Sequence, residues 1–220
     1  MLGTGGGLRV VDVGGGTGGF AVPLARAGHD VTVIDASPDA LAALSRRAAE
    51  AGVAQRVHPV QGDADGIADV VEPASADLVL CHSVLEVVDA PADVAAAVAT
   101  TLRPGGAASL LVANRAAAVL ARAAAGQFDL AVAALQDERG RTGERDTLRR
   151  RYDADSVTAL LAKAGLTVEE IHGVRVVADL VPGGVAEREQ EALVAFELEA
   201  ASRQPYRDIA SQLHLLARRS

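Results

Sequence analysis

A run of glycines directly after an apolar stretch is the feature that most restricts how this chain can fold. Residues 8–11, Leu-Arg-Val-Val, predict a strand, and residues 12–18 follow as Asp-Val-Gly-Gly-Gly-Thr-Gly. Glycines permit a tight turn and a close backbone approach to a ligand, which a Cβ would prevent. The loop also satisfies the dinucleotide fingerprint Gly-x-Gly-x-x-Gly, and glycine-rich turns occur without ligands. The loop alone therefore favours a ligand site and leaves the ligand open.

An acidic residue ends the next predicted strand. Residues 31–35 are Val-Thr-Val-Ile-Asp, and ligands of open α/β sheets bind at the carboxyl ends of the strands. Asp35 is thus placed to accept hydrogen bonds from two ribose hydroxyls. Ser37 and Pro38 supply a good N-cap and first position for the following helix, so we expect Asp35 to be free for a ligand.

Strands and helices alternate through the first half, which predicts a mostly parallel sheet with helices on both faces. A third strand ends at Asp63, with Asp65 as a competing acid, and a fourth runs into His82. Residues 102–106, Leu-Arg-Pro-Gly-Gly, form a turn before the fifth strand. Strands are expected at residues 8–13, 31–35, 56–60, 76–81 and 107–113, and helices at 19–27, 38–51, 65–72 and 91–102.

The second half shows a different pattern of elements. The sequence predicts a helix over 115–125 closed by residues 126–129, an arginine-rich loop, a helix over 155–164, an extended segment over 168–179, an amphipathic helix over 187–201 and a last strand over 212–218. The apolar stripe of residues 193, 194, 196, 198 and 201 is expected to pack in the core. This gives seven strands, of which the last two are expected to be antiparallel.

Composition limits the class of protein. The 220 residues suit one domain, and with only 2% aromatic residues the core must be built from Ala, Val and Leu. No apolar run is long enough to span a membrane, and no signal-peptide pattern is present, so we expect no membrane partner. The single cysteine, Cys81, fits a reducing cytoplasm and a small buried side chain, and no cluster has metal-ligand spacing.

One basic segment interrupts this acidic chain. The net charge is −8, which argues against non-specific binding to nucleic acid. Residues 139–151 nevertheless hold six arginines against two acidic residues, Glu144 and Asp146. The segment is either a solvated loop or a contact surface for a polyanion.

The glycine loop, Asp35 and the Leu-x-Pro-Gly-Gly turn together resemble class I S-adenosylmethionine (SAM) methyltransferases. The resemblance implies a Rossmann-like, seven-stranded α/β fold that uses SAM and releases S-adenosylhomocysteine. It implies a cofactor half at about residues 8–113 and a substrate-side half at about 114–220 of a single domain. The expected cofactor contacts are Asp12, Gly14, Gly15, Gly16, Gly18, Asp35, Ala36, Asp63, Ala64 and His82. For His82, packing beneath the cofactor loop is as consistent with the sequence as direct contact.

Residues 82–88, 114–129, 173–179 and 197–206 further resemble the family that methylates 5-carboxymethoxyuridine at the tRNA wobble position. The arginine-rich loop then occupies the place of a lysine cluster in that family, so Arg149, Arg150 and Arg151 are expected to bind tRNA. Family members carry an N-terminal helix with a cofactor-contacting arginine. Here only eight residues precede the first strand, so we expect the cofactor to be held weakly, with one side open.

The implied mechanism is an in-line attack on the SAM methyl group. A carboxylate acceptor is already ionised at pH 7 and needs no general base. Arginine binds carboxylates bidentately, and Arg175 and Arg115 are the candidates. The alternatives are a methyltransferase of a small carboxylic acid or other metabolite, a non-catalytic SAM-binding module and, least compatible with the late segments, a nicotinamide dehydrogenase.

Overall fold

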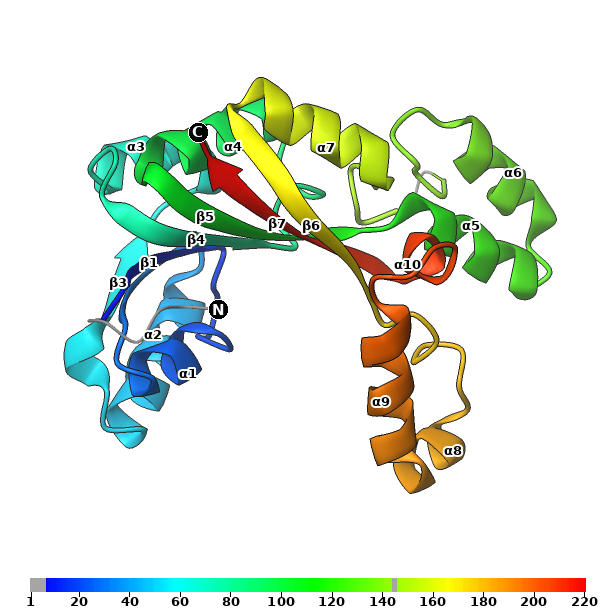
Figure 1. The fold of residues 1–220 in the computed structure, drawn as a ribbon, viewed down its shortest axis with the longest axis horizontal. Coiled ribbons are helices and arrows are strands. Elements are labelled where there is room, and N and C mark those ends of the chain that lie inside the picture. The colour runs from blue at the N-terminus through cyan, green and yellow to red at the C-terminus, as the bar shows by residue number, and fades with distance from the viewer. Residues whose placement is uncertain (1–6, 144–145) are drawn as a thin grey trace.

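A seven-stranded sheet runs through the computed structural model, which describes residues 7–143 and 146–220 (Figure 1). The strand order is β3-β2-β1-β4-β5-β7-β6. Strands β1 to β5 are parallel, and β7 lies antiparallel between β5 and β6. The predicted Rossmann-like α/β fold with an antiparallel C-terminal strand is confirmed. The strands are β1 (Arg9–Val13), β2 (Asp30–Asp35), β3 (Val57–Gln61), β4 (Ala76–His82), β5 (Leu102–Ala113), β6 (Leu166–Val174) and β7 (Gln212–Arg219).

The helices connect these strands and cover both faces of the sheet. Ser37 caps α2 as expected, because its hydroxyl accepts the N–H of Ala40, and Pro38 is the first helical residue. The helices are α1 (Ala21–Arg26), α2 (Pro38–Glu50), α3 (Ile67–Val70), α4 (Pro91–Thr101), α5 (Arg115–Ala124), α6 (Phe128–Gln136), α7 (Ala154–Lys163), α8 (Gly183–Arg188), α9 (Gln190–Ala200) and α10 (Tyr206–Ile209). Two short 3₁₀ turns are η1 (Ala54–Arg56) and η2 (Ala64–Gly66).

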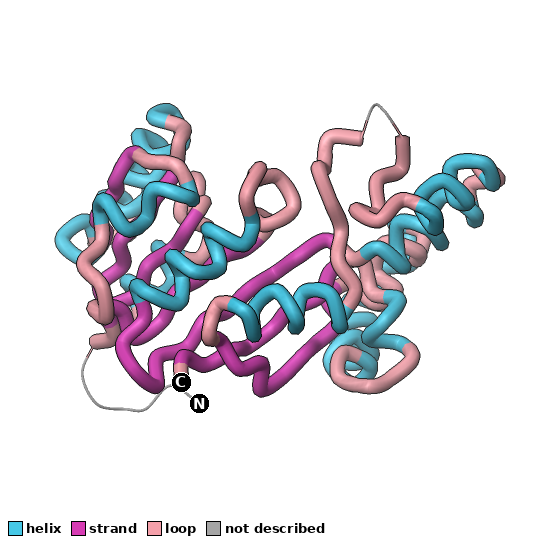
Figure 2. Tube along the Cα trace, turned by 90° about the horizontal axis from the view of Figure 1, so that it is seen from above, coloured by secondary structure: helices cyan, strands magenta, loops and turns pink. Residues whose placement is uncertain are grey.

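The core is aliphatic, as the composition requires. On one face α1 and α2 pack on β1 to β3 through residues such as Val22 and Leu44. On the other face α4 and α7 pack on β4, β5 and β7, with Val98 and Leu161 among the fully buried side chains. Figure 2 shows helices packed over the strands and a second group of helices, at the right of the view, that lies beyond one end of the sheet. Cys81 is fully buried, and burial raises its pKa to about 12, so it is the buried side chain that was expected.

Two strand boundaries differ from the prediction. β5 begins at Leu102 instead of residue 107, because Leu102 already pairs with Ala76 and a register shift absorbs the Pro-Gly turn. β6 ends at Val174 instead of residue 179. Arg175 has a φ of 57°, and the Glu197 carboxylate accepts the next three backbone N–H groups, so the chain turns away from the sheet.

The helices of the second half also differ from the prediction. Residues 128–129 do not close a helix but open α6, an additional helix before the arginine segment. The helix expected over 187–201 is broken at Glu189 into α8 and α9. Core packing of its stripe is wrong, since Val194 and Leu198 are 52% and 74% exposed. The physical reason is that α9 projects from the sheet and meets only a small cluster around Ala200 (Figure 1).

The residues before β1 lie largely outside the described residues, which begin at Gly7. The prediction that one side of the cofactor site is open concerns this segment and therefore stays a prediction. Across residues 7–143 and 146–220, no helix combines the length and apolar character needed to cross a membrane.

Candidate cofactor and substrate site

The glycine loop after β1 needs glycine for its own shape. The Gly14 N–H donates to the Ile34 carbonyl at 2.7 Å, with φ at +67°. A Cβ on Gly14 would lie 2.7 Å from a Val84 methyl carbon, and one on Gly15 would lie 2.5 Å from an Asp12 carboxylate oxygen. These two positions require glycine because a side chain there would collide with the protein itself. At Gly16 a Cβ would approach only the Asp35 carboxylate, at 3.8 Å, so on that side the backbone of the loop is open to a ligand.

Asp12 lies buried beneath this loop, with 2% of its surface exposed. Its Oδ2 has no hydrogen-bond partner among the described residues. Burial, followed by the neighbouring charge of Asp35, raises the pKa of Asp12 to about 7. The carboxyl is therefore substantially protonated near neutral pH.

Asp35 is less free than the sequence suggested. One carboxylate oxygen accepts the N–H of Gly16 and the other accepts the N–H of Ser37, each at 2.9 Å. Asp35 therefore ties the glycine loop to the end of β2. Each carboxylate oxygen has a second lone pair, so the side chain can still accept hydrogen bonds from two hydroxyls.

The parallel register brings the predicted cofactor residues to one edge of the sheet. Val13 pairs with both Ile34 and Cys81, and Asp35 pairs with Gln61, so the loops after β1 to β4 begin side by side. The residues that these loops gather are Gly14, Gly15, Gly16 and Gly18 after β1, Ala36 after β2, Asp63 and Ala64 after β3, and His82 at the end of β4. Asp63 and the competing Asp65 are both exposed, while Ala64 packs partly on the core.

His82 is a half-buried side chain with defined partners. Its Nε2 lies 2.9 Å from the Ser109 hydroxyl, and the edge of its ring meets Phe20 with a centroid distance of 4.7 Å. Burial, followed by the charge of His214, lowers its pKa to about 4, so the ring is neutral at physiological pH. Ser109 and His214 were not predicted from the sequence. The available signal was a polar residue between two buried apolar residues in each strand.

The two candidate carboxylate binders lie in different environments. Arg115 begins α5, and its guanidinium donates to the Leu135 carbonyl of α6 at 2.7 Å. Arg175 remains half exposed, with a 3.5 Å ion pair to Asp179. It lines an apolar hollow of about 480 Å³ between β6 and α9, and it is the more exposed of the two arginines.

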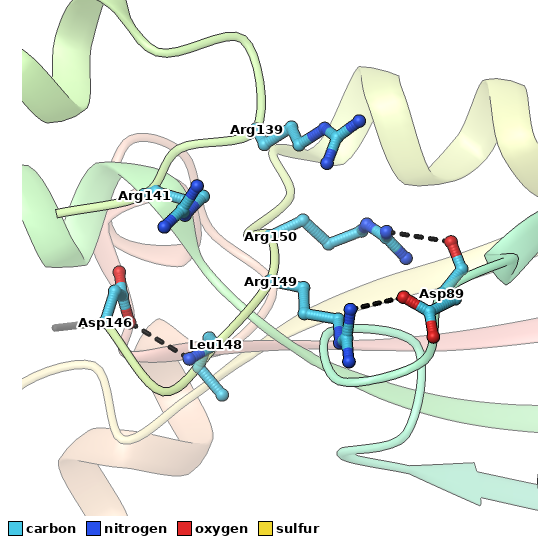
Figure 3. A pocket seen from close by; sticks show the side chains of 7 residues that line it. All are labelled: Asp89, Arg139, Arg141, Asp146, Leu148, Arg149 and Arg150. Atoms are coloured by element: carbon cyan, nitrogen blue, oxygen red, sulfur yellow. Dashed lines mark hydrogen bonds and ion pairs between the residues drawn. The ribbon is translucent and has the colours of Figure 1, made fainter. Parts of the chain in front are cut away.

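Arginine side chains surround a hollow of about 380 Å³ beside the loop that follows β4 (Figure 3). Arg149 forms an exposed ion pair with Asp89. Arg139 and Arg141 also line the hollow, and within the described parts of the chain their guanidinium groups form no ion pair. Arg145 and Glu144 lie outside the described residues.

The remaining arginines of this segment bind the protein itself. Arg150 donates to the backbone carbonyls of Val88 and Asp89 at 2.7 and 3.1 Å. Arg151 contacts both oxygens of Asp146, and the side chains of this pair are only 13% and 4% exposed. The three consecutive arginines therefore have different environments, and Arg151 faces inward.

In the part of the chain that the structure describes, no three His, Cys, Asp or Glu side chains are grouped closely enough to hold a metal ion.

Comparison with known proteins decides the family. Residues 10–106 match a family described as a methyltransferase domain. The tRNA 5-carboxymethoxyuridine methyltransferase of Escherichia coli (strain K12) is 32% identical over 213 residues, which cover 96% of this chain and 80% of that enzyme. The chain belongs to the class I SAM-dependent methyltransferases. A ubiquinone biosynthesis O-methyltransferase of Xanthomonas euvesicatoria is 34% identical over 76% of this methyltransferase and 66% of its own length.

Solved structures agree with the fold of this methyltransferase. A SAM-dependent methyltransferase from Mesorhizobium loti has a TM-score of 0.68 at 21% identity, covering 97% of this chain and 92% of its own. Magnesium protoporphyrin IX methyltransferase from Synechocystis, solved with bound S-adenosylhomocysteine, has a TM-score of 0.63 at 16% identity, covering 98% and 75%. The cofactor is SAM, and the bare glycine loop beside Asp35 suits it.

Proposed function

We propose that this methyltransferase transfers a methyl group to the carboxylate of 5-carboxymethoxyuridine at the wobble position of tRNA. The observation that carries the proposal is the extent of the likeness to the Escherichia coli tRNA enzyme. It covers 96% of the chain, well beyond residues 10–106, which match the methyltransferase-domain family. Residues 8–113 would then bind the cofactor and residues 114–220 the substrate, within a single domain in the cytoplasm.

The site chemistry is compatible with a carboxylate acceptor. SAM supplies the methyl group: a carboxylate oxygen forms the new C–O bond as the C–S bond breaks, and the electron pair stays on sulfur. A carboxylate is ionised at pH 7, so no side chain has to remove a proton. Arg175 would hold and orient the acceptor, and the glycine loop, Asp35 and His82 would position the cofactor. Catalysis would rest on alignment and exclusion of water.

The arginine hollow supports an RNA substrate. Arg139, Arg141 and Arg149 surround it, in a chain whose net charge is −8. Phosphate groups bind guanidinium through paired hydrogen bonds, and RNA binding by such contacts weakens with salt. Arg150 and Arg151 contribute by holding the loop in shape, which changes the role first expected for these two residues.

The test compares two double variants that remove the same charge. Arg139→Ala with Arg141→Ala should weaken binding of tRNA that carries carboxymethoxyuridine and lower the salt slope by about 1.4, at about 0.7 per phosphate contact. Arg26→Ala with Arg46→Ala, on α1 and α2, should leave both unchanged. Methyl transfer is followed by mass spectrometry of the tRNA nucleosides. Equal binding and slope for the two double variants would show that the hollow is only a solvated surface.

A small-molecule acceptor is the second candidate, because the ubiquinone biosynthesis O-methyltransferases match three quarters of the chain. The same assay separates the candidates. Methylation of a small carboxylic acid or phenol without activity on the tRNA would favour the metabolite. SAM binding without transfer to either would favour a non-catalytic module.

A further inference from the structure

A chain of hydrogen bonds crosses three strands next to the cofactor edge. The His82 Nε2 on β4 lies 2.9 Å from the Ser109 hydroxyl on β5. The same hydroxyl lies 2.8 Å from Nε2 of His214 on β7. In the register, Leu111 is opposite both His82 and His214, so these side chains share one face of the sheet. Ala108, Leu110 and Val112 of β5 pack in the core formed with α4 and α7. Ser109 alternates with these residues, so the hydrogen-bonded side chains lie on the opposite face of the sheet, which is the face that α1 covers (Figure 1).

The chain allows only two arrangements of its protons while His82 and His214 are neutral. A hydroxyl donates one hydrogen bond, so Ser109 donates either to His214 or to His82. If it donates to His214, it accepts from His82, which then carries its proton on Nε2. If it donates to His82, the proton of His82 must sit on Nδ1. Nδ1 of His82 is buried and has no hydrogen-bond partner among residues 7–143 and 146–220, and a buried N–H without an acceptor is costly. The first arrangement is therefore favoured, with Nδ1 bare.

The surroundings keep this chain uncharged. Within the chain, His214 acts on His82; the titratable groups beside the chain are His172 and Glu170 on β6, which act on His214. The rings of His172 and His214 are stacked at 6.1 Å, and His172 lies 3.7 Å from Glu170. Burial is the first cause that lowers the pKa of both His82 and His214. On the other side, Phe20, which precedes α1, meets the His82 ring in an edge-to-face contact.

We propose that Ser109 and His214 are positioning residues of the cofactor site, which fix the ring orientation and the Nε2-protonated tautomer of His82. SAM carries a positive sulfonium group, whereas S-adenosylhomocysteine is neutral. The bare Nδ1 is enclosed by protein, so it would act on the sulfonium through space and not by direct contact. The lone pair of a neutral ring attracts the positive charge, whereas an N–H at that nitrogen or an imidazolium repels it. The chain would thus favour the charged cofactor over the neutral product. The inference rests on the placement of His82 at the cofactor edge and is independent of the methyl acceptor.

The test compares Ser109→Ala with Ser109→Thr, which keeps the hydroxyl in a strand that accepts β-branched residues. Calorimetry should show about 3–10-fold weaker SAM binding for Ser109→Ala and less than about twofold for S-adenosylhomocysteine, the scale of one lost hydrogen bond. Ser109→Thr should bind SAM like wild type. Thr100→Ala, which removes an exposed hydroxyl of α4 that donates to the Ala96 carbonyl, is the control and should also bind SAM like wild type. His214→Leu should also weaken the binding of SAM more than that of S-adenosylhomocysteine, as Ser109→Ala does.

A spectroscopic measurement separates positioning from general damage. Nitrogen-15 chemical shifts of histidine rings distinguish the tautomers, and the His82 signals are those absent from His82→Gln. Wild type should show Nε2 protonation from pH 6 to 8, and Ser109→Ala should show a mixture. Equal weakening of SAM and S-adenosylhomocysteine, an unchanged tautomer in Ser109→Ala, or failure of Ser109→Thr to restore SAM binding would each overturn the proposal. If wild type binds neither ligand, the cofactor assignment itself fails.

Discussion

Asp12 gives the molecule a pH dependence that a surface carboxylate would not. Its pKa rises from 3.8 to about 7, first because it is buried and then because Asp35 is close. The folded protein therefore binds a proton that the unfolded chain releases near pH 4. Its contribution to stability is present below pH 4 and is lost as the pH rises towards 7.

Asp12→Asn should remove this pH dependence, because the amide keeps the size of the side chain and cannot ionise. From pH 4.5 to pH 8, the wild-type free energy of unfolding should lose a few kcal/mol more than that of the variant, at about 1.4 kcal/mol per unit of pKa shift. Urea unfolding without cofactor measures both. If the free energy of unfolding changed equally with pH in both proteins, the pKa of Asp12 would not be raised in the folded state.

Single residues were predictable where a local pattern defined them. Asp35 and His82 follow recognisable strands, and the structure places both at the expected edge. The contact between Ser109 and His214 was not predictable, because it joins residues 105 positions apart and needs the antiparallel placement of β7. The two hydrogen bonds that engage Asp35 depend on the three-dimensional turn of the glycine loop.

At the level of elements, the arginine-rich loop of residues 139–151 is fixed by hydrogen bonds to the loop after β4 and by ion pairs, and not by regular secondary structure of its own. The backbone N–H groups of Arg149 and Arg150 donate to the Glu86 carbonyl. Burial raises the pKa of Asp146, but hydrogen bonds from Arg151 and Thr142 outweigh it and hold that pKa well below its usual range. The segment and the loop after β4 are therefore parts of one unit.

This arrangement predicts unequal effects for two neighbouring arginines. Arg151→Ala leaves the enclosed Asp146 carboxylate without its cationic partner and with only the hydrogen bonds from Thr142 and Leu148, and should cost about 3 kcal/mol of stability. Arg149→Ala removes an ion pair whose side chains are 55% and 82% exposed, and should cost about 0–1 kcal/mol. Arg151→Lys should lie between them, because lysine keeps the charge and loses the paired geometry. Thermal unfolding of the three variants decides; similar losses for both alanine variants would contradict the distinction.

Elements with strong local signals were predictable, such as α2 with its Ser37 cap. Helix α6 was not, because Gly126 and Gln127 suggested the end of a helix and the following turn depends on packing against α5. The exposure of α9 could not be predicted from the spacing of its apolar residues. An apolar stripe shows that a helix has an apolar face but not whether anything covers it.

At the level of the whole molecule, cofactor binding should appear as stability, because SAM binds only the folded chain. At a hundredfold excess over its Kd, SAM should add about 2.7 kcal/mol, which corresponds to about 5–10 °C in Tm for a domain of this size. NAD should give no shift. Asp35→Ala should reduce the SAM shift, while Asp39→Ala, on the first turn of α2, should not. A shift with NAD and none with SAM would contradict the cofactor.

Strand β5 has a consequence for how the enzyme would turn over. It pairs with β4, which ends in His82, and on its other side with β7. One ladder of hydrogen bonds thus joins the parallel part of the sheet to its antiparallel part, and it would have to break before β1 to β5 could rotate away from β6 and β7. We therefore expect the sheet to keep its shape through the reaction cycle, as one continuous template and not as two lobes that open and close.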